Sequence, residues 1–247
     1  MTSFVEVAED RRWFGFLSRW SLAAGVVILA LMVAFVAGVL PAAQGGDLPS
    51  RYMELAAAIE SPAVYRLTIA LDVVTWLMLV GFFVALGAIL HRHAPVRGAL
   101  VVACGVGQVS GVIGGFMRLN GTSGTAELYV GADPARQEAL LLAYSYLQSA
   151  VLSHFNAGTL LWGAALLLAA SAAWSLEGFP RWLAVVVAIP GAVRLPVSVV
   201  EISTGADLGF AILPQLLLLV AAFFCVAWTF RRRGAAGAVV HGTGASA

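Results

Sequence analysis

The chain has 247 residues, of which 61% are hydrophobic and only 11% are charged, and its mean hydropathy is +0.92. A soluble globular protein carries about 25% charged residues, so this composition excludes a soluble domain and a disordered chain. The net charge of +1 provides no basic field, which excludes a nucleic-acid partner. All 14 basic residues are arginine, so no lysine is available for Schiff-base chemistry. The composition indicates an integral membrane protein whose surroundings are the lipid bilayer.

Six segments are apolar and long enough to cross a membrane as helices. A span needs about 20 predominantly apolar residues to cover a hydrocarbon core of about 30 Å. The predicted spans are 20–40, 66–90, 96–117, 140–174, 182–200 and 208–230. The first lacks a convincing signal-peptide cleavage site and is expected to remain as an anchor. The predicted fold is therefore an all-α integral membrane protein, a bundle of six transmembrane helices.

The arginines predict the orientation of this bundle, because cytoplasmic loops carry an excess of positive charge. With the N-terminus inside, nine arginines lie on the cytoplasmic side and four on the outer side. This orientation puts both termini in the cytoplasm and makes the cell (inner or plasma) membrane the expected location. The outer loops near 41–63 and 119–138 are then long, whereas the inner turns at 91–97 and 175–181 are short.

The predicted organisation has three parts: a cytoplasmic N-terminal segment (1–19), the six-helix transmembrane domain (20–230) and a disordered, Gly/Ala-rich cytoplasmic tail (231–247). The fourth segment is longer than a membrane requires. A helix from Pro134, with Asp133 as its N-cap, to Trp174 would measure about 60 Å. We expect it to protrude on the outer side, to tilt strongly or to break.

Polar residues inside the spans carry the main functional signal, because each one is costly in hydrocarbon. On the predicted topology nearly all of them fall in the outer half of the membrane. This distribution predicts either a polar cavity that binds a ligand or a hydrogen-bonded core that only holds the helices together. The expected lining residues of such a cavity are Trp76, Gln108, Tyr144, Tyr146, Gln148, His154, Asn156, Arg194 and Gln215.

Two acidic residues within the spans are candidate catalytic groups. Asp72 lies in the second span, where an ionised carboxylate needs a partner. Its expected partner is Arg194 or Arg66. Glu201 shares one helical face with Arg194, so these two side chains either pair with each other or Arg194 snorkels to the interface. For each acid, a purely structural ion pair is the alternative to catalysis.

Glycines and prolines mark two of the predicted helices. Gly107, Gly111 and Gly115 recur at four-residue spacing in the third span, and such a face lets another helix approach closely. We interpret it as packing within the chain, with a partner helix on this face as the alternative. Pro190 and Pro196 are expected to kink the fifth span.

No cofactor and no metal site is expected. Only His154 of the four histidines lies within a span, whereas a membrane b-type haem needs two facing ligands. His91 and His93 stand two residues apart and point away from each other on a helix. Cys104 and Cys225 lie in apolar runs, where packing is the usual role. The sequence contains no Gly-rich phosphate loop, nucleophile elbow or zinc motif.

Several short motifs resemble the DUF4386 family of small bacterial six-span membrane proteins. They are His154-Phe-Asn-Ala-Gly158, Leu161-Trp162-Gly163, Gly178-Phe179-Pro180-Arg181-Trp182 and Pro190-Gly191, together with Tyr65-Arg66-Leu67 leading into Asp72. The turn before Trp182 departs from the family's usual Ser-Gly-Phe-Leu-Pro-Arg. The resemblance implies a six-span architecture and carries over no catalytic residue.

Two classes of function fit these observations. The first is a cofactor-free enzyme of the cyclase or isomerase type that acts on a lipophilic small molecule by acid catalysis. Asp72 would donate the proton, with Glu201 as the alternate donor or the base, and aromatic faces would stabilise a carbocation. The second is a non-enzymatic membrane module: a small carrier, a ligand sensor or an accessory subunit of a membrane complex. Spans 1–3 and 4–6 show no internal repeat, which argues against a repeat-built carrier.

Overall fold

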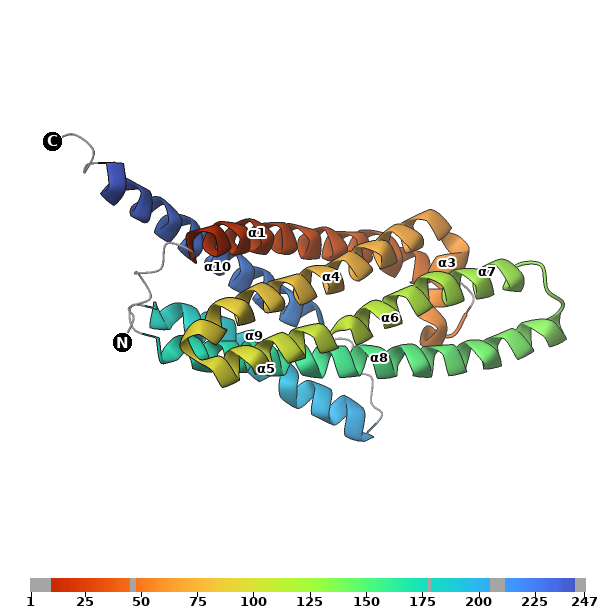
Figure 1. Cartoon of the computed structure of the whole chain (residues 1–247). Helices are drawn as coiled ribbons and strands as arrows, with labels where there is room; N and C mark the ends of the chain where they lie inside the picture. Colours follow the sequence, from red (N-terminus) through yellow and green to blue (C-terminus); the bar gives the residue numbers. More distant parts are fainter. Residues whose placement is uncertain (1–9, 45–47, 177–178, 205–211, 243–247) are drawn as a thin grey trace. The chain divides into compact units, whose positions relative to one another are not determined.

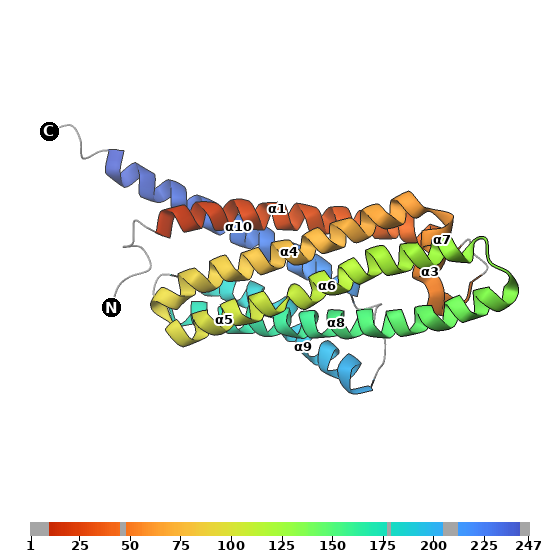
Figure 2. The same ribbon diagram turned by 45° about the vertical axis from the view of Figure 1, so that its right-hand side comes forward.

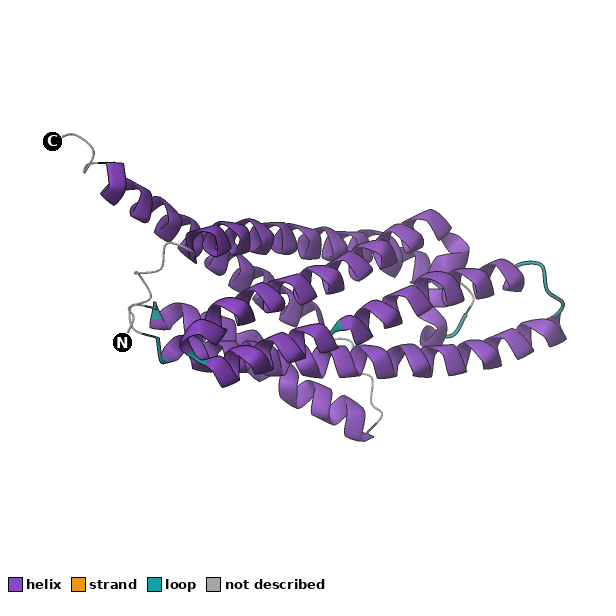
Figure 3. Cartoon of the chain, in the orientation of Figure 1, coloured by secondary structure: helices purple, strands orange, loops and turns teal. Residues whose placement is uncertain are grey.

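The computed structural model describes residues 10–44, 48–176, 179–204 and 212–242 (Figure 1). Every regular element in these ranges is a helix, and no strand occurs in them (Figure 3). Within lipid a helix satisfies its backbone hydrogen bonds internally, which is why apolar segments of this length adopt it. The predicted all-α fold with six spans is confirmed, because six of the described helices are long and apolar enough to cross a membrane.

The six membrane-crossing helical stretches contain the predicted spans or overlap them closely. They are Trp13–Gln44, Pro62–His93, Pro95–Tyr129, Pro134–Trp174, Arg181–Thr204 and Leu213–Arg232. The sixth predicted span began at 208, and positions 205–211 lie outside the described residues. Most stretches run past the predicted ends, because polar residues beyond the apolar core continue the same helix. The orientation of the two termini stays a prediction.

The helices are named in chain order, with two π-helical turns (η1, η3) and one 3₁₀ turn (η2) among them. They are α1 (Asp10–Ala34), η1 (Phe35–Val39), α2 (Leu40–Gln44), η2 (Ser50–Tyr52), α3 (Met53–Glu60), α4 (Pro62–His93), α5 (Pro95–Gly107), α6 (Val109–Met117), η3 (Arg118–Thr122), α7 (Ser123–Tyr129), α8 (Pro134–Trp174), α9 (Arg181–Thr204) and α10 (Ile212–Gly242). Helix α10 thus extends into the predicted disordered tail, of which positions 243–247 lie outside the described residues.

The two long outer loops that the sequence predicted are largely helical. In place of the loop near 119–138, η3 and α7 continue the third span to Tyr129, and α8 begins at Pro134. In place of the loop near 41–63, η2 and α3 form a short helical segment whose Leu55 is fully buried. The loop predictions were wrong because these segments bury apolar side chains although their composition is mixed. In both views α3 lies beside α7 (Figure 1 and Figure 2).

Helix α8 is continuous over 41 residues. The predicted N-cap is confirmed, since the backbone N–H of Arg136 donates to Oδ1 of Asp133 at 3.0 Å. Helix α9 likewise continues through Pro190 and Pro196 without ending at either proline.

Contacts between Cα atoms divide the chain into two compact units. The first unit comprises residues up to 26, 78–107 and those from 160 onward, and the second comprises 27–77 and 108–159. No linker in the sequence marks this division, because three of its boundaries fall within α1, α4 and α8 and the fourth falls at the turn between α5 and α6.

Glycines set the closest helix contacts in the second unit. A Cβ on Gly115 would lie 2.6 Å from Cγ2 of Val73, and one on Gly158 would lie 3.1 Å from the backbone nitrogen of Gly111. The indole of Trp76 covers Gly111 itself. This is the packing role predicted for the third span's glycine face, while a partner helix on that face stays a prediction.

Replacing Gly111 with alanine is expected to lower the free energy of unfolding by about 1–3 kcal/mol, the usual cost of overpacking. The new methyl group would overlap the Trp76 ring, which is only 5% exposed and has no room to move. Thermal unfolding of the purified protein in detergent measures the effect. Gly124→Ala is the matched control, because no heavy atom lies within 4 Å of its added Cβ. Equal melting temperatures for the two variants would contradict this packing.

Candidate functional site

Arg118 lies between two carboxylates in the second unit. Its Nε and Nη2 donate to the two oxygens of Glu54 at 3.0 and 2.7 Å, a bidentate pair. Its Nη1 donates to Oδ2 of Asp72 at 2.9 Å. We call Glu54, Asp72 and Arg118 the Arg118 cluster. One guanidinium therefore holds two acids that lie 64 and 46 residues away in the chain.

Three elements bring these side chains together. Glu54 stands in the first turn of α3, where the positive end of the helix dipole favours a carboxylate. Asp72 lies within α4, and Arg118 is the first residue of the π-helical turn η3. At that turn the backbone N–H of Arg118 contacts the carbonyls of both Gly114 and Gly115. Such π-turns are rare and occur frequently at functional sites.

Aromatic side chains surround the cluster. The guanidinium of Arg118 lies over the ring of Phe155, 5.2 Å from its centroid, in cation–π geometry. The Phe155 ring in turn lies 5.7 Å from that of Trp76. The hydroxyl of Tyr65 donates to Oε2 of Glu54 at 3.4 Å. An apolar shell of this kind strengthens the ionic contacts within it.

The cluster has an excess of acid. With both carboxylates ionised, one positive and two negative charges leave a net charge of −1. An uncompensated charge is costly within a membrane-spanning region. Binding of one additional proton would bring the cluster to neutrality and remove this cost. The three side chains are partly accessible: 14% of the Arg118 side chain is exposed, 15% of Asp72 and 26% of Glu54. Charge balance and accessibility together make this the candidate site.

The expected partners of Asp72 were wrong. Arg66 instead pairs with Glu127 on an exposed surface, and Arg194 pairs with Glu201. Arg118 takes their place because the third span does not end at 117 as predicted. The helix continues through η3, which keeps the Arg118 side chain within the helical packing.

The predicted pairing of Arg194 with Glu201 is confirmed in the first unit. Nη2 of Arg194 donates to Oε2 of Glu201 at 2.6 Å, and Nη1 donates to Oε1 of Gln215 at 3.3 Å. All three residues are buried, at 3%, 6% and 1% exposure. Among the described residues, these contacts join two positions of α9 to each other and to α10. The catalytic role of Glu201 stays a prediction.

The other predicted site residues of the second unit occupy varied positions. Tyr144 is buried in the apolar cluster that also holds Tyr52 and Tyr65, whereas Tyr146 is 73% exposed. Nδ1 of His154 lies 3.1 Å from the hydroxyl of Ser110. Four more were predicted there. Trp76 and Asn156 are buried, and Gln108, the residue that follows α5 and precedes α6 in the chain, is fully buried. Gln148 donates to the Arg51 carbonyl at 3.2 Å.

Sequence reasoning missed Arg118, Glu54, Tyr65 and Phe155 as site residues. A usable signal for Glu54 is its place in Met53-Glu-Leu-Ala-Ala-Ala-Ile-Glu60, a helix-forming run bounded by turn residues on both sides. Tyr65 and Phe155 give no such signal, because an aromatic residue in a span is ordinary.

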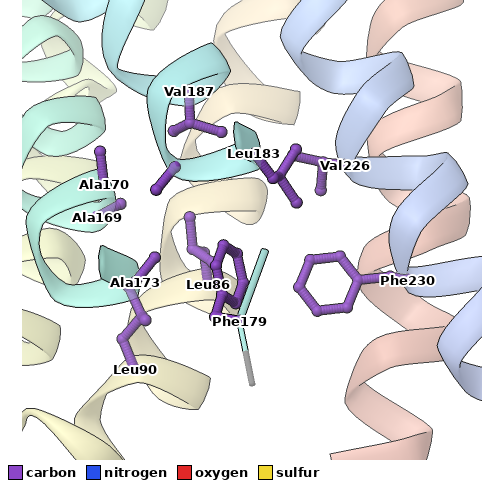
Figure 4. Close-up of a pocket in the computed structure, with 11 residues that line it drawn as sticks. Leu86, Leu90, Ala169, Ala170, Ala173, Phe179, Leu183, Val187, Val226 and Phe230 are labelled. Atoms are coloured by element: carbon purple, nitrogen blue, oxygen red, sulfur yellow. The ribbon is translucent and has the colours of Figure 1, made fainter. Parts of the chain in front are cut away.

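A small cavity in the first unit has a wholly apolar lining (Figure 4). Its side chains include Leu86, Phe179, Val187 and Phe230. Its volume is about 20 Å³, little more than a single water molecule needs. This cavity is too small for a lipophilic substrate and offers no group that could react.

Among the described residues no group of three or more His, Cys, Asp or Glu side chains could hold a metal ion. Cys104 and Cys225 are half-buried and are not joined to each other by a disulfide.

A sequence model of the family described as a domain of unknown function, DUF4386, matches residues 15–231. This match confirms the resemblance and extends it over most of the chain. No curated protein matches the chain, and no solved structure matches it.

Removing the shared guanidinium should strongly destabilise the second unit. Arg118→Met leaves two carboxylates side by side without a cation. Breaking a fully buried ion pair in this way costs about 3–5 kcal/mol, and this partly exposed cluster should lose a smaller amount. Chemical or thermal unfolding in detergent measures the loss. The control is Arg66→Met, which breaks the exposed pair with Glu127 and should cost less than about 1 kcal/mol.

A second variant separates charge from side-chain packing. Adding Glu54→Gln and Asp72→Asn to Arg118→Met removes the unbalanced charges, so stability should partly recover. If the triple variant is less stable than Arg118→Met alone, the repulsion argument fails.

Proposed function

The chain belongs to the DUF4386 family, and because that description assigns no activity, we propose a function from the chain's own residues. The protein is a multi-pass membrane protein with six helices able to cross the bilayer. We propose that it catalyses an acid-dependent isomerisation or cyclisation of a lipophilic small molecule. We further propose that it does so in the cell membrane, with both termini in the cytoplasm.

One observation carries this proposal: two carboxylates share the guanidinium of Arg118. Of these three residues, Asp72 and Arg118 lie in helical stretches that are long and apolar enough to cross a membrane. Glu54 makes two hydrogen bonds to Arg118 and so neutralises it. Asp72 makes one, through Nη1. Asp72 is therefore the acid that carries the additional proton, and it can release that proton without breaking the bidentate pair. An acid that is kept protonated by its surroundings is what general acid catalysis requires.

The proposed reaction begins and ends on Asp72. Its carboxylic O–H protonates a carbon–carbon double bond of the substrate, which becomes a carbocation, and Asp72 becomes a carboxylate. The faces of Trp76 and Phe155 stabilise the cation through their ring quadrupoles. Loss of a proton from a neighbouring carbon back to Asp72 gives the rearranged product. The step balances without a cofactor, and it does not need Glu201, which lies in the other unit.

The position of the cluster supports a lipophilic substrate. Asp72 and Arg118 belong to helices that can span the membrane, so a molecule reaching them would approach through the lipid. The residual exposure of Asp72 and Glu54 gives such a molecule access. Of the other predicted binding residues, all except Arg194 and Gln215 belong to the second unit with Asp72.

The test compares the lipids and small molecules of three strains: one lacks the gene, one carries it intact, and one carries Asp72→Asn. A compound should accumulate in the null and Asn strains, and its product should occur only with the intact gene. Purified Asp72→Asn should then convert that compound at least about 10²-fold more slowly, the lower range for losing a general acid. Glu127→Gln, which alters only the exposed pair, is the control that should retain activity.

The second candidate is the non-enzymatic module. It is favoured by the place of Glu54 on α3, a helix of only 8 residues, because losing the contact with Arg118 would free α3 to move. A carrier or ligand sensor could use that movement. Identical metabolite profiles in all three strains would contradict the enzyme. A stable hetero-complex on crosslinking in native membranes would then identify an accessory subunit.

A further inference from the structure

A groove on the first unit runs between α8 and α9. Its volume is about 400 Å³, within the range of roughly 300–1,000 Å³ that small-molecule sites occupy. Small side chains on α9, from Ala184 through Ala188 to Ala192, form much of its lining, while Leu167 and Trp174 contribute from α8. From Ala184 to Ala192 the groove extends over roughly 12 Å at 1.5 Å per residue.

One end of the groove is cationic. The guanidinium of Arg181 lies over the ring of Trp174, which lines the groove, at 5.6 Å from the centroid. On the α8 side, Nη1 of Arg97 donates to the carbonyl of Ser171, also a lining residue, at 2.9 Å and to the Ser175 hydroxyl at 3.2 Å. Both arginines are exposed. Within the described chain, neither has a carboxylate partner.

The surroundings of this end match the level of lipid headgroups. Trp174 and Trp182 each expose 51% of their surface beside Arg181. Exposed tryptophan next to arginine, at the end of a spanning helix, is typical of the membrane–water interface, where lipid phosphates lie. An apolar groove that opens at one end onto two cations is complementary to a molecule with an apolar chain and an anionic head.

We propose that this groove binds an anionic phospholipid, with one acyl chain along α8 and α9 and the phosphate between Arg181 and Arg97. The acyl chain would contact the alanine and leucine side chains of the groove. The phosphate would contact two guanidinium groups, and arginine is well suited to bind phosphate. The site lies wholly within the first unit and is independent of the proposed reaction at the Arg118 cluster.

The test uses the full chain in detergent and native mass spectrometry, titrated with phosphatidylglycerol or with phosphatidylcholine of the same acyl chains. Phosphatidylglycerol should bind more tightly. Arg181→Gln should weaken its binding about fivefold, the change that corresponds to about 1 kcal/mol for one arginine at a lipid surface. Ala188→Leu fills the groove and should weaken binding of both lipids.

Arg232→Gln is the matched control, because Arg232 also lies over an exposed tryptophan, Trp228, at 4.2 Å, without lining the groove. It should leave phosphatidylglycerol binding unchanged. An equal loss in Arg232→Gln, equal binding of the two lipids, or full binding by Ala188→Leu would each overturn the site. The site would also be overturned if the protein formed a dimer and Ala188→Leu abolished it. The occupant of the groove would then be a second copy of the chain.

Discussion

The arrangement of the second unit depends on the cost of placing the Arg118 guanidinium within a membrane-spanning region. A charge there requires partners that bring hydrogen bonds as well as opposite charge. Glu54 and Asp72 supply both, from α3 and α4. Because both acids bind one side chain, the position of α3 is tied to that of α4 and to the π-turn η3. Leu55, Tyr65 and Tyr144 belong to one buried apolar cluster in the same unit.

Close backbone approach is the second condition for this geometry. The helix that carries Arg118 meets α4 through Gly111 and Gly115, which face Trp76 and Val73. Larger residues at these two positions would push the helices apart and lengthen the contact between Arg118 and Asp72. The glycine face and the ion-pair cluster therefore act together: the glycines permit the distance that the charges require.

The sequence alone predicts the features that depend on composition or on contacts within a single helix. Spans follow from apolar length, the cap at Asp133 follows from local chemistry, and the pairing of Arg194 with Glu201 follows from a separation of 7 residues on one face. The partner of Asp72 is a different problem. Its distance of 46 residues from Arg118 gives no periodicity to detect, and the contact needs the register of two helices and a π-turn that no residue type encodes. Glu54 was missed because its helix lies where the sequence predicted a loop.

Arg194 and Arg118 lie in different surroundings, and this difference explains why Arg118 is the centre of the candidate site. Among the described residues, Arg194 contacts Glu201 on its own helix and the amide of Gln215 on α10, and all three side chains are buried. These contacts join α9 to α10. Arg118 is half-buried and contacts two carboxylates, so the charges of its cluster cancel only when a proton is present. Such an arrangement favours a group that can give up a proton and take it back.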